Sequence, residues 1–167
     1  WVLPTLLSVM LLATGVWGYT QYRQRLQYRT YLENQYQKSF YELVDHVGNL
    51  EVKLSKMMVT ATPSQNILLL TDVWRQSNAA QQNLGQLPIS HQVLGKTAKF
   101  INQLGDFCYS LSKGAADGKT IGQKHMEQLQ SLYNNSVILN KELRSLENQI
   151  NQGGVQWGEI KVKGDSQ

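Results

Sequence analysis

Apolar side chains in the first half of the chain recur at alternating steps of four and three residues. The series is Tyr36, Phe40, Leu43, Val47, Leu50, Leu54 and Met57. This spacing is the a/d pattern of a helix that packs against other helices along one seam. A second such series, with one polar member, is Leu129, Leu132, Ser136, Leu139, Leu143, Leu146 and Ile150. The two series predict that long, laterally packed helices dominate the fold.

Breaks in the helical pattern divide the chain into segments. Pro63, Gly85-Gln86-Leu87-Pro88, the glycine-containing stretch 114–118 and Gly153-Gly154 are the breaks. They predict helices over about 20–60, 64–86, 90–113 and 120–152, with Ser64 and Ser90 as N-caps and a capping box at Thr120 and Gln123. The inner faces of the two middle helices are expected to carry Ile67, Leu70, Trp74, Ser77 and Leu84, then Val93, Leu94, Ile101, Leu104, Cys108 and Leu111.

No strand pattern is long enough to build a sheet. Four amphipathic helices with short connections bury their apolar faces most simply as a bundle. We therefore predict an all-α fold: an antiparallel or elongated four-helix bundle with coiled-coil-like seams over residues 20–152, preceded by a single transmembrane helix. The heptads of the first and last helices also allow pairing between chains, so self-association is an open alternative.

The N-terminal segment 1–19 has no ionisable side chain except the phenol of Tyr19. As a helix it would extend about 28 Å, close to the ~30 Å hydrocarbon thickness of a bilayer. Trp1 at one end and Trp17, Tyr19 and Tyr22 at the other fit interfacial aromatic belts. A membrane anchor is therefore predicted. A secretory signal, for which Val16-Trp17-Gly18 is a poor cleavage site, and a buried core helix are the alternatives.

The residue types that carry catalysis or bind metal do not gather in the sequence. His46, His91 and His125 are far apart, and Cys108 lies on an apolar face without a neighbouring base. No phosphate-binding glycine motif is present. A net charge of +4 is too small an excess for a dedicated nucleic-acid binder. We predict no catalytic, metal-binding or cofactor-binding residues and no nucleic-acid partner.

Much of the polar surface consists of amides, while charged residues make up only 17% of the chain. Amides are easier to desolvate than charges, so weakly charged faces suit contacts between proteins. Compositional drift is the equally weighted alternative. The amides are Gln21, Gln24, Gln27, Gln35, Gln37, Gln81, Gln82, Asn83, Gln128, Gln130, Asn134 and Asn135.

Four stretches resemble the N-terminal domain of the spore germination protein YpeB family. They are ENQYQKSF at 33–40, DVWR at 72–75, GQLP at 85–88 and GDFCY at 105–109. Their order and spacing are similar to those of that family from the anchor to about residue 150. The resemblance implies a single-pass protein of the spore inner membrane with its body facing the cortex. Arg23, Arg25 and Arg29 after the anchor would by themselves favour the opposite orientation.

The resemblance also implies a partner, the cortex-lytic enzyme SleB. On that basis the chain is a non-enzymatic domain that stabilises, localises or restrains the enzyme until germination. Residues 153–167 would then be a linker toward PepSY-type domains that this chain lacks. A membrane-anchored helical sensor that responds to a ligand is the alternative function, and an enzyme is a third.

The stretches that carry the resemblance also supply a candidate partner interface: Trp74, Arg75, Asp106, Phe107 and Tyr109. Trp74 is expected to fill the bundle, with Arg75 outside it or bridged to a carboxylate. Gly105 would let two helices approach closely or would kink one. Phe107 and Tyr109 cannot face the same core stripe. Either one of them is exposed as an anchor for a partner, or both pack beneath a loop.

Overall fold

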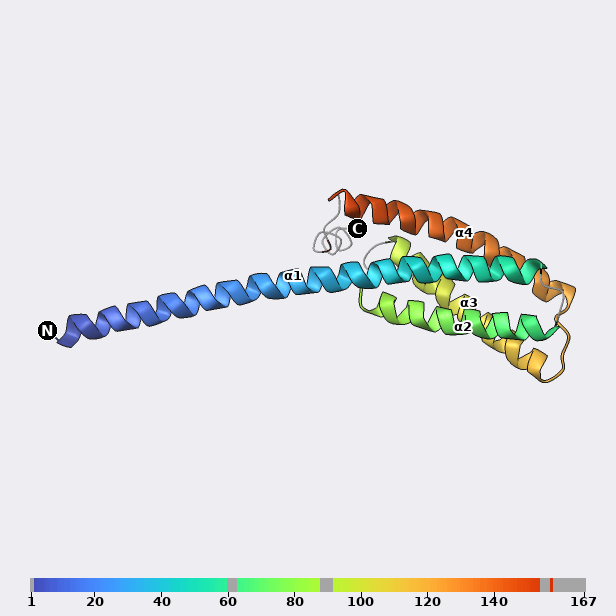
Figure 1. Ribbon diagram of the computed structural model, residues 1–167, viewed down its shortest axis with the longest axis horizontal. Helices are drawn as coiled ribbons and strands as arrows, with labels where there is room; N and C mark the ends of the chain where they lie inside the picture. Colours follow the sequence, from blue (N-terminus) through green and yellow to red (C-terminus); the bar gives the residue numbers. More distant parts are fainter. Residues whose placement is uncertain (1, 60–62, 88–91, 154–156, 158–167) are drawn as a thin grey trace. The chain divides into compact units, whose positions relative to one another are not determined.

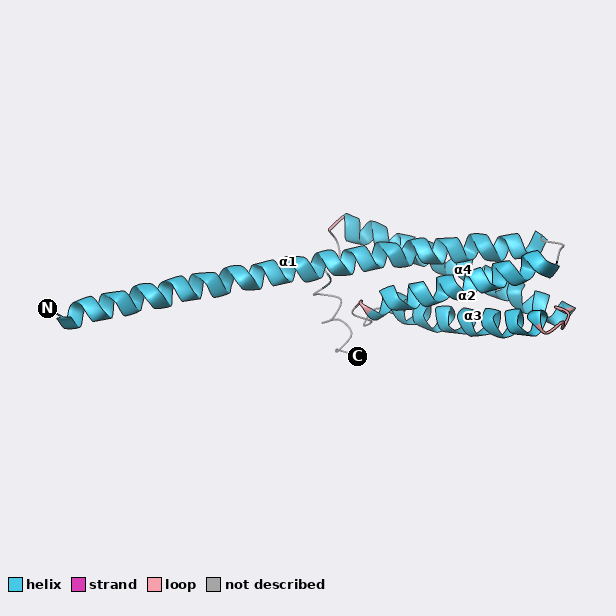
Figure 2. Ribbon diagram, turned by 60° about the horizontal axis from the view of Figure 1, so that its bottom comes forward, coloured by secondary structure: helices cyan, strands magenta, loops and turns pink. Residues whose placement is uncertain are grey.

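The computed structural model is all-α throughout the residues that it describes, which are 2–59, 63–87, 92–153 and 157. Of residues 2–9, 11–13 and 63 it describes the backbone only. The four helices are α1 (Val2–Val59), α2 (Pro63–Gly85), α3 (Gln92–Ala116) and α4 (Gln123–Asn151) (Figure 1). Helices and loops, without a strand, make up this described part of the chain (Figure 2). The predicted all-α fold with four helices is confirmed.

The helix ends differ from the sequence prediction in informative ways. α1 is continuous, so the predicted anchor and the first predicted bundle helix are parts of one helix. The predicted capping box at Thr120 is wrong, because the N-cap of α4 is Gly122, which makes no side-chain cap hydrogen bond. Gln123 instead donates its amide to Glu127 Oε1 at 3.4 Å. The predicted N-cap Ser90 lies outside the described residues.

The chain divides into two compact units, residues 1–37 and residues 38–167. In the second unit, contacts between neighbouring helices pair rising residue numbers on one helix with falling numbers on the other. Each neighbouring pair is therefore antiparallel, as predicted, and the helices enclose a common core. The contacts are Ser39–Gln86 and Lys53–Asp72 for α1 and α2, Trp74–Tyr109 and Gln81–Asn102 for α2 and α3, Lys96–Glu142 and Phe107–His125 for α3 and α4, and Tyr41–Asn151 and Glu51–Asn140 for α1 and α4.

The core lies where the heptad series of the four helices meet. On α1 the predicted series is buried from Phe40 to Met57, and on α4 Leu129, Leu139, Leu143 and Leu146 are buried. Small polar side chains complete the core at Ser77, Thr97 and Ser136, all 0% exposed. The hydroxyls of Thr97 and Ser136 donate to backbone carbonyls of their own helices, at 2.7 Å in each case, which satisfies these groups without a partner across the core.

The prediction was wrong about the inner face of α2 at one position. Trp74 does not fill the bundle: it is 36% exposed, whereas Val73 is fully buried. The buried series on α2 is Leu70, Val73, Ser77, Ala80 and Leu84, with regular steps of three and four. A helix turns by about 100° per residue, so a tryptophan next to a core valine points toward the surface.

The described residues of the first unit, 2–37, belong to α1 alone. Its described side chains from residue 14 to residue 32 are all exposed. Within the described residues, none of the helices combines the length and the apolar character needed to cross a membrane. The predicted anchor at 1–19 falls largely on residues 1–9 and 11–13, whose side chains lie outside the described set, and it stays a prediction.

The segment after α4 returns to the bundle at one described residue. Gly153 has a φ of +71°, which suits a residue without a Cβ just beyond a helix end. Trp157 is buried, and its ring lies edge-on against Phe40 with centroids 5.4 Å apart. The other residues of the predicted linker 153–167, namely 154–156 and 158–167, lie outside the described residues.

Candidate partner interface

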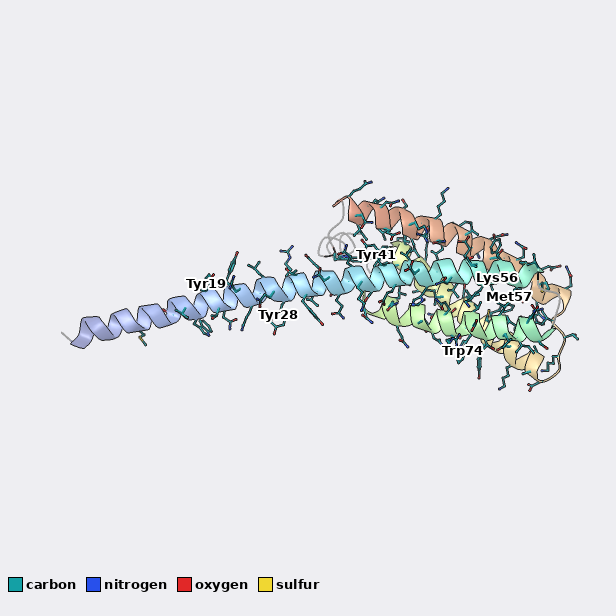
Figure 3. All side chains as sticks on the ribbon, in the orientation of Figure 1. Tyr19, Tyr28, Tyr41, Lys56, Met57 and Trp74 are labelled. Carbon is teal, nitrogen blue, oxygen red and sulfur yellow. The ribbon has the colours of Figure 1, made fainter. Side chains whose placement is uncertain are left out.

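Two aromatic side chains from different helices lie together on the surface of the bundle. The ring centroids of Trp74 on α2 and Tyr109 on α3 are 5.2 Å apart, with the ring planes inclined by 38°. Trp74 is 36% exposed and Tyr109 48% exposed. Figure 3 shows Trp74 on the outer side of α2. The antiparallel pairing of α2 and α3 thus brings together two residues that are 35 positions apart in the sequence.

A carboxylate bridged by two cations lies two residues before the tryptophan in the sequence. Asp72 accepts a hydrogen bond from Lys53 Nζ at 3.0 Å and another from Arg75 Nη2 at 2.6 Å. The hydrogen bond from Lys53 lowers the pKa of Asp72, and the positive charges of Lys53 and Arg75 act in the same direction. The side chain of Arg75 is 77% exposed. It is therefore outside the bundle and also bridged to a carboxylate.

The remaining two candidate residues are placed differently. Asp106 is exposed, and within the described residues it forms no ion pair. Phe107 is half-buried, and its ring centroid lies 6.5 Å from that of His125 on α4. Of the two aromatic residues that could not share a core stripe, Tyr109 is the one at the surface. The structure therefore brings Trp74 and Tyr109 together between α2 and α3, pairs the exposed Arg75 with Asp72, and places Phe107 near His125 of α4.

The four stretches that carry the family resemblance pair with one another in space. Ser39 of the first stretch donates its hydroxyl to Gln86 Oε1 of the third at 2.8 Å. Trp74 of the second stretch contacts Tyr109 of the fourth. These stretches therefore lie at helix–helix contacts of the bundle, where α1 meets the end of α2 and where α2 meets α3.

A groove between α3 and α4 is a surface feature that the sequence analysis missed. It has a volume of about 260 Å³, and Phe100, Ile138 and Leu139 supply its apolar lining. Lys96 and Glu142, whose Nζ and Oε1 atoms are 3.6 Å apart, belong to its rim. Ile138 is 60% exposed and stands outside the heptad series of α4, so the core pattern gave no signal for it.

Chemically reactive groups are dispersed or buried. In the described ranges no three or more His, Cys, Asp or Glu side chains come close enough to hold a metal ion. His46 Nδ1 lies 2.5 Å from Gln76 Nε2, and His91 lies outside the described residues. Burial raises the pKa of the Cys108 thiol to about 12, so at neutral pH it remains protonated and poorly nucleophilic.

These features define an antiparallel four-helix domain with an exposed aromatic pair between α2 and α3 and an ion-paired carboxylate between α1 and α2. The chain belongs to the YpeB N-terminal family, whose model matches residues 24–159. The resemblance stated from the sequence is therefore confirmed. No solved structure matches this chain significantly.

Three curated relatives are each called sporulation protein YpeB. The protein of Oceanobacillus iheyensis is 26% identical over 97% of this chain and 36% of its own length. The protein of Halalkalibacterium halodurans is 31% identical over 93% of this chain and 35% of its own length. The protein of Bacillus subtilis is 27% identical over 96% of this chain and 36% of its own length. This chain therefore spans about a third of the length of these relatives, none of which is named as an enzyme.

Proposed function

We propose that this chain is the non-enzymatic binding domain of a sporulation protein and that it holds a spore cortex-lytic enzyme of the SleB type until germination. In this role it stabilises, localises or restrains the enzyme. The proposal includes a membrane anchor at 1–19 in the spore inner membrane and a body that faces the cortex. Membership of the YpeB N-terminal family supports the setting.

The observation that carries the binding role is the exposed pair Trp74–Tyr109, with the exposed Arg75 following Trp74 in the sequence. Tryptophan, tyrosine and arginine are the residues most enriched among those that dominate binding energy at protein interfaces. The contact with Tyr109 and the bridge from Arg75 to Asp72 hold these side chains in place before a partner arrives. Side chains that are already ordered lose less conformational entropy on binding.

Attachment to a membrane would let a modest affinity suffice. Confining two proteins to one surface raises the effective concentration of each for the other. A fully exposed, strongly apolar surface is then unnecessary. The partly exposed rings of Trp74 and Tyr109, each of which carries a polar group, are consistent with such an interface.

The test is a binding titration between the purified chain and the purified hydrolase. We expect the double variant Trp74→Ala with Tyr109→Ala to raise the dissociation constant by about tenfold or more, as for the loss of a central aromatic anchor. The matched control is Ile138→Ala, which removes an exposed apolar side chain from α4. It should leave affinity unchanged within about twofold. Absence of binding up to about 100 μM, or equal losses in both variants, would contradict the proposal.

The α3–α4 groove favours a second candidate function, that of a ligand sensor. Its apolar lining beside a paired lysine and glutamate combines shape with a few polar groups, as small-molecule sites do. A ligand that binds there would stabilise the fold by mass action. The test is a thermal-shift screen of small molecules. A compound that raises the unfolding temperature of the parent chain but not that of Ile138→Trp would support sensing, and a screen in which no compound raises it would reject sensing.

A further inference from the structure

A second series with heptad spacing lies on α1 in the first unit. It consists of Trp17, Gln21, Gln24, Tyr28, Tyr31 and Gln35, at steps of four, three, four, three and four. We call these six residues the amide–aromatic seam. None of them belongs to the series that fills the bundle core. Trp17, Tyr28 and Tyr31 are 67%, 70% and 66% exposed, the two central glutamines are exposed, and Gln35 is half-buried.

Charge is absent from this seam although it is frequent nearby. Residues 17–35 contain four charged side chains, Arg23, Arg25, Arg29 and Glu33, all outside the seam. Three of them interact within the helix. The guanidinium of Arg23 lies 5.8 Å from the centroid of the Tyr19 ring, and Arg29 Nε lies 3.3 Å from Glu33 Oε1.

The seam side chains differ in this respect from the charged face. Within the described residues, no side-chain hydrogen bond, ion pair or ring contact is found for the six seam residues. Three charged residues outside the seam thus interact within the helix, whereas five of the six seam side chains are exposed and make no such contact. An unpaired helix is only marginally stable in water, and packing normally supplies most of its stability.

The chemistry of the seam is self-complementary. A glutamine amide carries both donors and an acceptor, so two identical amides facing each other can exchange hydrogen bonds. Two copies of a charge-free seam meet without like-charge repulsion, whereas a strongly acidic or basic partner would find no opposite charge on it. In the heptad register of the seam, Arg25 takes an e position and Thr20 the preceding g position. In a parallel pair Arg25 would therefore face the uncharged Thr20 of the second copy. Polar seam residues also fix register, at a cost in stability.

We propose that residues 17–35 of α1 pair with the same residues of a second copy of the chain, as a parallel, in-register coiled coil through the amide–aromatic seam. Most residues of the core heptads of α1 and α4, which the sequence also offered for pairing between chains, are buried inside the bundle and are not available. The proposed pairing goes beyond hydrolase binding and is independent of it, because it uses a different unit of the chain.

The test is disulfide cross-linking of the full 167-residue chain carrying one introduced cysteine. Gln24→Cys and Tyr28→Cys report on the seam, and Arg23→Cys and Leu26→Cys are matched controls on the charged face. A disulfide needs Cα atoms within about 7 Å, which a parallel, in-register pair provides only for identical seam residues. The native Cys108 is buried, so the parent chain gives the background.

We expect dimer bands on non-reducing gels to form about five to ten times faster for the seam variants than for the controls. Equal rates on the two faces, or rates at background for all variants, would overturn the proposal. A mixture of Gln24→Cys and Tyr28→Cys chains that cross-links only between the two different variants would also overturn the proposal, because that pattern indicates antiparallel pairing.

A charge variant gives an independent readout. Gln24→Glu introduces like charges into the seam of a pair, whereas Thr30→Glu adds the same charge on the other face. By sedimentation equilibrium we expect the dimer dissociation constant to rise about fivefold or more for Gln24→Glu and less than about twofold for Thr30→Glu. Circular dichroism checks that helix content is unchanged. A parent chain that is monomeric at about 100 μM, or equal effects of the two variants, would refute the pairing.

Discussion

Gly105 of α3 faces Ser77 of α2 so closely that a Cβ on the glycine would lie 3.3 Å from the serine Cβ. Ser77 is 0% exposed, and its hydroxyl has no hydrogen-bond partner within the described residues. The two helices therefore approach each other across one of the smallest pairs of side chains available. The close approach expected at Gly105 is confirmed, and the Trp74–Tyr109 pair lies one turn away along both helices.

Replacing glycines on α3 should distinguish helix propensity from packing. Apart from its own helical turn, no described residue lies within 4 Å of the position that a Cβ on Gly95 would take. Gly95→Ala should therefore raise the free energy of unfolding by about 0.5–1 kcal/mol. Gly105→Ala should lose that gain to crowding, and Gly105→Val should lower the free energy by about 1–3 kcal/mol. Urea unfolding monitored by circular dichroism measures all three. Equal gains from both alanine variants would contradict the close packing.

The buried register of α2 can be tested at two adjacent residues. Val73→Ala should lower the free energy of unfolding by about 1–3 kcal/mol, because it removes two buried methyl groups and leaves a cavity. Trp74→Ala should cost less than about 1 kcal/mol, because the indole is partly exposed and packs mainly on Tyr109. The reverse order in urea unfolding would place the tryptophan in the core.

The stability that Cys108 contributes should depend on pH in the alkaline range. The thiol has an ordinary pKa of 9.0, which burial raises to about 12 in the folded chain. Between these values the native state retains a proton that the unfolded state has lost. The contribution is therefore fully present below pH 9.0 and decreases above it, by up to about 1.4 kcal/mol per pH unit.

The measurement for Cys108 is the difference in free energy of unfolding between the parent chain and Cys108→Ala. That difference should be constant from pH 7 to pH 8.5 and should shift in favour of the alanine variant by pH 10. In addition, a thiol reagent at pH 8 should modify the unfolded chain and leave the folded chain unmodified. Rapid modification of the folded chain would mean that the thiol is accessible.

The ion pairs of Asp72 with Lys53 and Arg75 should contribute modestly to the free energy of unfolding, and only above acidic pH. Asp72→Asn should lower the free energy of unfolding by less than about 1 kcal/mol, because the carboxylate is partly exposed to solvent. The folded pKa is lowered from 3.8, so this contribution is fully present above pH 3.8 and disappears as the pH falls through the folded value.

Asp106→Asn is the matched control for the bridge. Asp106 forms no ion pair within the described part of the chain, and its substitution should change the free energy of unfolding by less than about 0.5 kcal/mol. Urea titrations at pH 7, 4.5 and 3 compare the two variants with the parent chain. A loss in Asp72→Asn that persisted undiminished at pH 3 would mean that the carboxylate does not supply the effect.

The sequence alone determined the number of helices, their approximate limits and most of the core. Heptad spacing is visible in the sequence, and a helix face that is buried along its length requires such spacing. The burial of the series from Phe40 to Met57 could therefore be predicted directly. The family membership followed from short stretches in a fixed order. The same pattern misplaces Trp74, because Val73 and Trp74 follow Leu70 by three and by four residues and helical spacing allows either to be buried.

Only the tertiary structure decided which surface residues meet. Antiparallel packing of α2 and α3 brings Tyr109 to Trp74, and that of α1 and α2 brings Lys53 to Asp72. It also opens the groove around Ile138, a residue that no periodicity marks. Periodicity along one helix says which face is buried. The neighbours of an exposed side chain depend on the register between helices, which close contacts such as Ser77–Gly105 set.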